Sequence, residues 1–347
     1  MGARPNFPKL APVYRAGVSA GIEQVVVHTG QHYDDLLSEG FFRDLQIPSP
    51  HVNLEVGSGS HAQQTARIME RFEPVLIAEQ PDWLVVYGDV NSTMATALVA
   101  AKLGVRIAHV EAGLRSGDRT MPEEVNRLVA DRLASLLLTP SRDAGEALRS
   151  EGVLPEQIVF VGNVMIDSLL HALPSAIATD TANRMGRPGE HVVVTLHRPS
   201  NVDDPTRLRA LIDALARIAS VRPVLFPMHP RTRERLEQSN LDAGAVILMD
   251  SLPYFEMVDL VRSAYAVVTD SGGLQEETTA LGVPCFTVRD NTERPVTVTE
   301  GTNQLVKHPS QLPQLVAGVS RSTSHNIPEG WDGRAAERVM AALGDAR

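Results

Sequence analysis

The stretch AYAVVTDSGGLQEETTALGVPCFTVRD, residues 264–290, decides the fold class. An apolar run at 264–273 leads into a segment with helical spacing at 272–282, and a second apolar run follows at 283–290. Strands joined through a helix run parallel, so this order predicts a strand–helix–strand unit. Valine-rich runs of this kind are typical of strands that are buried on both faces.

The same rhythm occurs in both halves of the 347-residue chain. The other expected strands are 24–30, 82–89, 105–111, 135–140, 157–163, 190–198, 222–230 and 245–250. The other expected helices are 61–80, 91–104, 122–134, 204–220 and 333–343. We therefore expect an α/β fold with two doubly wound, Rossmann-like domains that face a cleft.

The segment 170–188 has weaker periodicity and suits a connection between domains. We expect a first domain at 1–168 and a second at 169–330. The remaining residues, 331–347, are expected to form a C-terminal helix that packs back on the first domain, because their apolar stripe must be covered.

Composition excludes several classes of function. The formal net charge is −10, which disfavours a nucleic-acid or membrane surface, since such surfaces are usually basic. No apolar run approaches the roughly 18 residues of a membrane span, and the N-terminus does not have the pattern of a signal peptide. The sole cysteine, Cys285, cannot form an internal disulfide and has apolar neighbours. We expect a cytoplasmic protein in which Cys285 is a core residue.

The second half carries a candidate phosphate site. Ser271, Gly272 and Gly273 open a helix directly after a strand, where glycines allow close approach and free N–H groups attract anions. Glu277, about one turn later, can accept hydrogen bonds from a ribose diol, and Arg294 can neutralise phosphate. This spacing favours a nucleotide diphosphate site over a glycine-rich connection followed by a solvated acidic helix.

Carboxylates follow two expected strands in the first half. Asp89 and Glu111 each come directly after a buried strand, and Glu123 begins a helix. The carboxyl ends of parallel strands line the ligand crevice, so these acids fit general acid/base chemistry. Glu123 taken alone also fits an ordinary first-turn carboxylate. Mg²⁺ binding is a further possibility, but no dense carboxylate cluster or histidine spacing supports a metal.

Two histidines follow strands of the second half. His197 lies beside an arginine and opposite the proposed phosphates, which favours a functional role. For His229, a structural and a functional role are equally supported.

Recognisable motifs are distributed along nearly the whole chain. In order they are GARPNFPKLAP, HTGQHYD, VYGDVNST, HVEAGLRSGDRTMPEEVNR, VGNVMID, TLHRP, DSGGLQEET and RDNTERPVTVTEGTN. The sequence resembles the non-hydrolysing UDP-N-acetylglucosamine 2-epimerases. The resemblance implies a fold similar to the GT-B glycosyltransferases, a homodimer, and no metal or nicotinamide cofactor. It also implies interconversion of UDP-GlcNAc and UDP-ManNAc, through elimination of UDP to 2-acetamidoglucal and re-addition, for cell-surface polysaccharide precursors.

The resemblance also implies a role for each matching residue. Asp89, Glu111 and Glu123 would be the acid/base carboxylates, and His197 would assist departure of the diphosphate. The substrate-binding positions would be Arg4 and Lys9 in the N-terminal loop, Leu252 and Met257 at uracil through backbone groups, Ser271, Gly272 and Gly273 at phosphate, Glu277 at ribose, and Arg294.

Gln31 and His32 match a second, regulatory nucleotide-sugar contact of the family. Asp34 stands where another amide is expected, so we expect weak or absent activation by substrate. Members of the family carry an apolar strand just before the N-terminal loop. None precedes it here, so we expect a mobile N-terminus and weakened activity.

Four other functions stay open on sequence alone. A hydrolysing epimerase would release UDP and free N-acetylmannosamine, and a related 2-epimerase would act on a UDP-diacetamido sugar. A GT-B glycosyltransferase would need an acceptor, and three acids around one sugar carbon argue against it. A non-catalytic UDP-sugar sensor would bind without exchange at C2.

Overall fold

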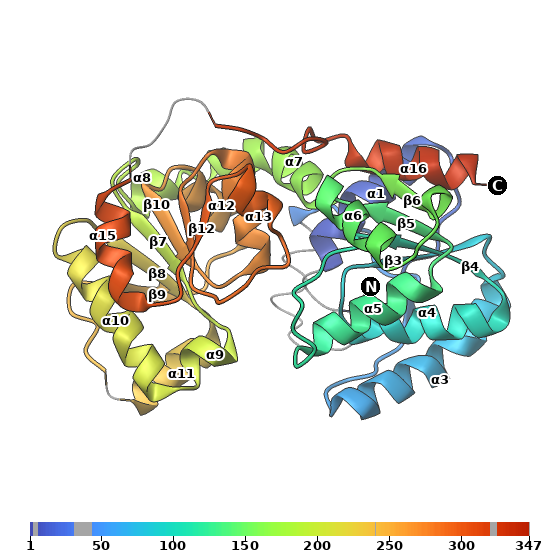
Figure 1. Ribbon diagram of the computed structural model, residues 1–347, viewed down its shortest axis with the longest axis horizontal. Coiled ribbons are helices and arrows are strands. Elements are labelled where there is room, and N and C mark those ends of the chain that lie inside the picture. The colour runs from blue at the N-terminus through green and yellow to red at the C-terminus, as the bar shows by residue number, and fades with distance from the viewer. Residues whose placement is uncertain (3–5, 31–43, 240, 320–324, 347) are drawn as a thin grey trace. The chain divides into compact units, whose positions relative to one another are not determined.

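The computed structural model describes residues 1–2, 6–30, 44–239, 241–319 and 325–346. These form two compact units (Figure 1). Unit 1 comprises Met1–His171 and Glu329–Arg347, and unit 2 comprises Ala172–Pro328.

Parallel strands form the centre of unit 1. A four-stranded sheet has the order β3-β4-β5-β6, and β1 pairs with β2 in a separate two-stranded sheet. The strands are β1 (Val27–His28), β2 (Val52–Asn53), β3 (Trp83–Tyr87), β4 (Arg106–Val110), β5 (Leu136–Thr139) and β6 (Ile158–Phe160).

Helices flank these strands. They are α1 (Phe7–Ser19), α3 (His61–Glu79), α4 (Asn91–Leu103), α5 (Pro122–Leu133), α6 (Arg142–Ser150), the 3₁₀ turn η2 (Pro155–Gln157), the first part of α7 (Val164–Ala178), and α16 (Ala335–Asp345). The last of these, α16, packs beside α1 (Figure 1). Ile68 of α3, Ala97 of α4 and Ile107 of β4 belong to one buried core, so both helices pack on this sheet.

Unit 2 contains one six-stranded parallel sheet of order β12-β11-β10-β7-β8-β9. Its strands are β7 (Val192–Thr195), β8 (Val224–Met228), β9 (Ile247–Asp250), β10 (Ala266–Thr269), β11 (Cys285–Thr287) and β12 (Asn303–Leu305). Its helices are the end of α7, α8 (Thr181–Met185), α9 (Pro199–Val202), α10 (Pro205–Ala219), α11 (Pro230–Gln238), α12 (Tyr254–Arg262), α13 (Gly272–Leu281), α14 (Val296–Thr299), η3 (Pro309–Gln311) and α15 (Leu312–Ala317).

The strand order of unit 2 reverses between β7 and β10. From β7, strands β8 and β9 follow in one direction across the sheet. Strand β10 returns to the other side of β7, and β11 and β12 then follow in the opposite direction. In doubly wound sheets, ligands bind beyond the carboxyl ends of the strands at such a reversal. The segments that follow β7 and β10 therefore lie where a ligand site is expected.

Two helices differ from the sequence expectation. The N-terminal stretch, expected to be a loop, enters α1 at Phe7, with Asn6 as N-cap and a proline in the first turn. Proline is well suited to that position because its fixed φ matches the helix and its missing N–H needs no partner. The segment 170–188 is largely helical in α7 and α8, and Pro174 inside α7 explains its weak pattern.

The first residue is hydrogen-bonded, although it was expected to be mobile. The α-ammonium group of Met1 donates to the Val27 carbonyl at 2.8 Å, and the Thr29 N–H donates to the Met1 carbonyl at 2.9 Å. Met1 therefore pairs with the edge of β1.

Cys285 on β11 is 1% exposed, and burial raises the pKa of its thiol to about 11. Within the described ranges, no helix has the length and apolarity needed to cross a membrane.

Within unit 1, the C-terminal segment approaches the backbone closely at Gly162. Gly162 has a φ of 83°, and a Cβ there would lie 2.0 Å from the Gly330 carbonyl oxygen. Gly152 has a similar φ of 84°, but a Cβ there would meet nothing within 4 Å. The two positions therefore separate backbone strain from a steric clash.

We predict that Gly162→Ala destabilises unit 1 by more than about 3 kcal/mol, because strain and clash add. The control Gly152→Ala should cost only about 1–2 kcal/mol for the left-handed conformation. Both tryptophans, Trp83 and Trp331, lie in unit 1, so their fluorescence during urea unfolding measures the loss. Equal losses in the two variants would contradict the close approach.

Candidate functional site

In unit 1, two carboxylates follow neighbouring strands. Tyr87 at the end of β3 lies opposite Val110 at the end of β4, so Asp89 and Glu111 come just beyond the same edge of the sheet. Glu111 has a φ of 70°, which is uncommon for a residue with a Cβ. Such strain is maintained only where the surrounding contacts hold it.

Lys9 is the partner of Glu111. Its Nζ forms a buried ion pair with Glu111 Oε2, and both side chains are 5% exposed. Gly88 makes room for this pair, because a Cβ there would lie 2.5 Å from Lys9 Nζ and 3.0 Å from Glu111 Oε2. The expectation that Lys9 lies in a loop was wrong, because α1 begins at Phe7 and includes this residue. From α1, its Nζ reaches Glu111, the residue that follows β4.

Arg127 on α5 holds Asp89. Its Nη2 lies 2.5 Å from Asp89 Oδ2, and its Nη1 lies 2.7 Å from Glu124 Oε2. The Asn126 amide also donates to the Asp89 carbonyl at 2.9 Å. The guanidinium therefore connects the end of β3 to the first turn of α5, where Glu123 is half-buried.

Glu124 is tied to the loop before α5. The N–H groups of Ser116 and Gly117 donate to its carboxylate at 2.9 and 3.0 Å. Burial acts to raise the pKa of Glu124, but these hydrogen bonds and Arg127 hold it below its usual value.

A buried histidine supports the Gly88 turn. His109, which is fully buried, places Nε2 2.8 Å from the Gly88 carbonyl and Nδ1 2.6 Å from Asp131 Oδ1. Asp131 also accepts from Arg115 at 2.7 Å. These contacts fix the turn that makes room for Lys9 and Glu111.

In unit 2, Asp270 joins the ends of β7 and β10. Its carboxylate accepts from the N–H groups of His197 and Arg198 at 3.1 and 2.9 Å, and from the Asn201 amide at 3.1 Å. Burial acts to raise the pKa of Asp270, but the His197 ring, Asn201 and the backbone donors hold it below its usual value. The strand reversal is therefore fixed by one ionised carboxylate.

His197 is oriented by this carboxylate. Its Nδ1 lies 3.0 Å from Asp270 Oδ1, while 41% of its side chain remains exposed. The ring of His229 lies 6.1 Å from the His197 ring, centroid to centroid. His229 Nδ1 also accepts from the Arg231 N–H at 3.2 Å, which is a helix-capping contact at α11.

The predicted phosphate residues lie at the start of α13. Ser271 is the N-cap, and Gly272 and Gly273 are the first two helical residues. The first N–H groups of a helix have no partner within it and attract anions. A Cβ on Gly272 would lie 2.7 Å from Arg294 Nη1, so this glycine lets the arginine reach the start of the helix.

Arg294 is 7% exposed and lies among carboxylates. Its Nη1 is 2.5 Å from Glu293 Oε1, and its Nε is 3.1 Å from Glu276 Oε1. Arg289 pairs with the other side of Glu293 at 2.7 Å. The sequence interpretation assigned Arg294 to phosphate and did not anticipate these ion pairs.

Glu277 is buried next to Tyr254, whose hydroxyl donates to it at 3.2 Å. Burial raises the pKa of Glu277 to about 7, and Glu276 adds to this, although the tyrosine hydrogen bond opposes it. Leu252 and Met257 flank the start of α12 and pack partly buried against the core. The Met257 N–H donates to the Pro253 carbonyl at 2.9 Å.

Arg4, Gln31 and His32 fall outside the described residues. Sequence reasoning missed Arg127, Tyr254 and the partner role of Asp270. Only Arg127 carried a local signal, because it follows Glu124 by three residues on one helix face. In the parts of the chain that the structure describes, no group of three acidic, histidine or cysteine residues could hold a metal ion.

The family model for UDP-N-acetylglucosamine 2-epimerase matches residues 17–344. The chain belongs to this family. The motif resemblance to UDP-N-acetylglucosamine 2-epimerases is confirmed at the level of this family.

Two named 2-epimerases are similar to the chain over most of its length. It is 38% identical over 358 residues to the UDP-N-acetylglucosamine 2-epimerase of Methanocaldococcus jannaschii, covering 99% of this chain and 97% of that protein. It is 43% identical over 310 residues to the UDP-2,3-diacetamido-2,3-dideoxy-D-glucuronate 2-epimerase of Pseudomonas aeruginosa, covering 88% and 86%.

Solved epimerase structures share the fold. The M. jannaschii UDP-GlcNAc 2-epimerase in complex with UDP-GlcNAc and UDP gives a TM-score of 0.90 at 37% identity, covering 99% of this chain and 98% of that chain. The Neisseria meningitidis enzyme bound to UDP-GlcNAc gives 0.89 at 25% identity, covering 100% and 98%. These confirm the expected α/β fold with two GT-B-like, Rossmann-like domains.

We predict that Lys9→Met destabilises unit 1 by about 3 kcal/mol or more, because it leaves the Glu111 carboxylate buried without its cation. Adding Glu111→Gln should restore stability to within about 1 kcal/mol of the original chain, since the buried side chain that lost the Lys9 cation is then neutral. Urea unfolding followed by tryptophan fluorescence at neutral pH measures both variants. A double variant no more stable than Lys9→Met would refute the pairing argument.

Proposed function

We propose that this chain is a non-hydrolysing UDP-N-acetylglucosamine 2-epimerase that interconverts UDP-GlcNAc and UDP-ManNAc. The family match over residues 17–344 carries the proposal. The candidate groups in each unit support it. Unit 1 holds carboxylates suited to acid/base chemistry, and unit 2 holds a helix N-terminus suited to a diphosphate.

Unit 2 binds the UDP group in this proposal. The start of α13, with Ser271, Gly272 and Gly273, receives the diphosphate through N–H and hydroxyl groups. His197, oriented by Asp270 and partly exposed, donates to the diphosphate as it leaves. Arg294, Glu277, and the main chain at Leu252 and Met257 complete the site at phosphate, ribose and uracil.

Unit 1 supplies the acid/base groups, which we assign to Asp89, Glu111 and Glu123. One carboxylate removes the C2 proton while the C1–O bond breaks and its electron pair leaves with UDP. A C1=C2 double bond forms, which gives 2-acetamidoglucal. A second acid then protonates C2 from the opposite face while the UDP oxygen attacks C1, so that C2 is inverted and no atom is gained or lost.

The C2 proton is only weakly acidic, so most of the barrier must be lowered at the leaving group. This requirement explains why the proposed diphosphate site combines a helix N-terminus, a histidine and an arginine. Lys9 and Arg127 position Glu111 and Asp89 rather than acting on the sugar.

The family resemblance also supports a cytoplasmic homodimer that supplies UDP-ManNAc for cell-surface polysaccharides. It further supports Arg4 as a substrate contact, and Gln31 and His32 as a weak regulatory contact.

A second candidate is a 2-epimerase of a UDP-diacetamido sugar acid, favoured by the 43% identity to the Pseudomonas enzyme. The chemistry at C2 is the same for both substrates. Comparing kcat/KM for the two UDP-sugars separates the candidates.

The deciding experiment is incubation with UDP-GlcNAc alone in D₂O, followed by NMR. We expect deuterium at C2 and a mixture of two UDP-sugars with no free sugar. Accumulating N-acetylmannosamine would instead identify a hydrolysing epimerase. Binding without deuterium at C2 would refute the epimerase proposal and leave a sensor.

In the same assay, Asp89→Asn and Glu111→Gln should each lower turnover by at least roughly a hundredfold, because acid/base groups typically contribute that much. The matched control is Glu146→Gln, an exposed carboxylate on α6. Wild-type rates in either site variant, with normal folding, would remove that residue from the catalytic set.

The raised pKa of Glu277 predicts that substrate binding depends on pH. Ribose hydroxyls donate to the ionised carboxylate, whose pKa is raised to about 7, so affinity should increase as pH rises through that value. Between pH 6 and 8 we expect UDP-GlcNAc to bind about tenfold more tightly. Calorimetry in an Asp89→Asn background avoids turnover, and adding Glu277→Gln should flatten the profile. An identical slope in both proteins would exclude Glu277.

A further inference from the structure

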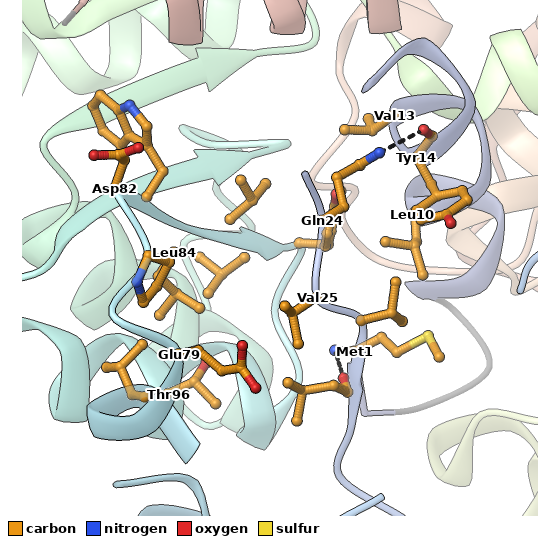
Figure 2. A pocket seen from close by; sticks show the side chains of 18 of the residues that line it. Met1, Leu10, Val13, Tyr14, Gln24, Val25, Glu79, Asp82, Leu84 and Thr96 are labelled. Atoms are coloured by element: carbon orange, nitrogen blue, oxygen red, sulfur yellow. Dashed lines mark hydrogen bonds between the residues drawn. The ribbon is translucent and has the colours of Figure 1, made fainter. Parts of the chain in front are cut away.

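The turn between β3 and α4 carries Asp89, and side chains from other parts of unit 1 hold it in place. Among the described residues, β3 pairs only with β4, and it also borders a cavity of about 430 Å³. Figure 2 shows Leu84 of β3 on one wall of this cavity and Val25 on the other. A void offers no packing atoms, so the position of the turn depends on its other contacts.

The backbone carbonyls of residues 87–89 each contact a side-chain nitrogen. The amide of Asn6 donates to the first carbonyl at 2.9 Å, and the amide of Asn126 donates to the third at 2.9 Å. The middle carbonyl, that of Gly88, lies 2.8 Å from Nε2 of His109. Of these three side chains, only the histidine can carry a charge.

Both ring nitrogens of His109 face oxygen atoms. In the described part of the chain, Nε2 contacts the Gly88 carbonyl and Nδ1 lies 2.6 Å from Asp131 Oδ1. Burial acts to raise the pKa of Asp131, but His109 and Arg115 hold it below its usual value, so the carboxylate is ionised and can only accept. A neutral imidazole carries one N–H and satisfies one of the two oxygens, whereas an imidazolium satisfies both.

The surrounding charges alternate in sign, which offsets the cost of burying a cation. Asp131 Oδ2 lies 2.7 Å from Arg115 Nη1, and Arg115 Nε lies 2.7 Å from Glu151 Oε1. The histidine is fully buried, whereas 38% of the Glu151 side chain is exposed. The row therefore runs from the buried ring to the surface with a cation and an anion in alternation.

Asp131 also holds the segment that follows Glu111. Its Oδ2 accepts from the Gly113 N–H at 3.1 Å, two residues beyond Glu111, whose φ of 70° needs contacts to maintain it. Asp131 is 4% exposed. One buried carboxylate thus contacts the segment after β4 directly and the turn after β3 through His109.

We propose that His109 is a buried imidazolium held by Asp131, and that this pair positions both proposed acid/base carboxylates. The ring fixes the Gly88 carbonyl and so the start of Asp89, while Asp131 fixes the chain just after Glu111. Both are positioning residues that act through the two acids. Hydrogen bonds from a charged donor are roughly twice as strong as neutral ones, which suits a turn beside a cavity. The positioning role rests on the proposed epimerase function, whereas the protonation state does not.

The first test is the protonation state of His109 in the wild-type chain. Histidine labelled with ¹⁵N is incorporated, and NMR correlations between ring protons and ring nitrogens are recorded at neutral pH. The signals that disappear in His109→Gln identify the residue, and we expect a proton on each nitrogen. His51 is the internal reference, because its Nδ1 accepts the Val26 N–H at 3.0 Å and so has no proton. An unprotonated nitrogen in His109 would overturn the proposal.

The second test is Asp131→Asn, which keeps the shape of the side chain and removes its charge. The new amide can donate to Nδ1 and still accept from Arg115, so His109 becomes neutral but keeps its contact with Gly88. We expect the Nδ1 proton to be lost from the spectrum. With UDP-GlcNAc, kcat should fall about tenfold or more while KM changes less than about twofold, because small displacements of reacting groups reduce turnover and the proposed UDP site lies in unit 2.

A second variant is His109→Gln, whose amide can donate to the Gly88 carbonyl but has no further donor ring nitrogen for Asp131. It should lower kcat by a similar factor. The matched control is Asp167→Asn, another buried carboxylate of unit 1, which accepts the N–H groups of Ala335 and Ala336 at 3.2 and 2.7 Å. It should keep the wild-type kcat and KM. Tryptophan fluorescence checks that each variant is folded.

Wild-type kcat in both folded site variants, or an equal loss in the control, would overturn the positioning role. A rise in KM without a fall in kcat would do so too, because weaker substrate binding would then explain the loss. A wild-type chain without exchange at C2 would refute the proposed function and the positioning role with it. The NMR result would still decide whether His109 is an imidazolium.

Discussion

The pairing of buried charges at the strand ends is the constraint on which both units depend. A parallel sheet collects the residues that follow its strands at one edge, and in this chain several of them are ionised. Burying an ionised group is costly unless a counter-charge or several hydrogen-bond donors replace water. Lys9 meets this need for Glu111, Arg127 meets it for Asp89, and backbone N–H groups meet it for Asp270.

The two units satisfy this constraint in different ways. In unit 1, cations on α1 and α5 reach the carboxylates, so the strand ends are held by helices that begin far away in the sequence. In unit 2, Asp270 draws its donors from the segment directly after β7, and the partly exposed His197 ring is the group it orients. One arrangement fixes carboxylates in position, and the other fixes donors beside a helix N-terminus.

Much of this architecture follows from patterns within short stretches of sequence. Most strands appear in the apolar periodicity, as do the helices α3, α4, α5, α10, α13 and α16, whereas the short strands β2 and β12 and the other helices were not anticipated. Asp89, Glu111 and Ser271 are recognisable because each follows a strand. The start of α1 was missed, since prolines at positions 8 and 12 weaken a helical interpretation of that stretch. The Arg127–Asp89 pair joins residues 38 positions apart, and the partners of Arg294 depend on how α13 packs. Such pairings are set by tertiary structure, so local spacing does not reveal them.

The burial of Cys285 has a practical consequence. Its thiol lies inside the sheet of unit 2, and its raised pKa leaves almost no thiolate at neutral pH. Maleimide dyes react with thiolates, so the native residue will not compete for label in the folded protein. Cysteines introduced at exposed positions can therefore carry fluorophores without first replacing Cys285.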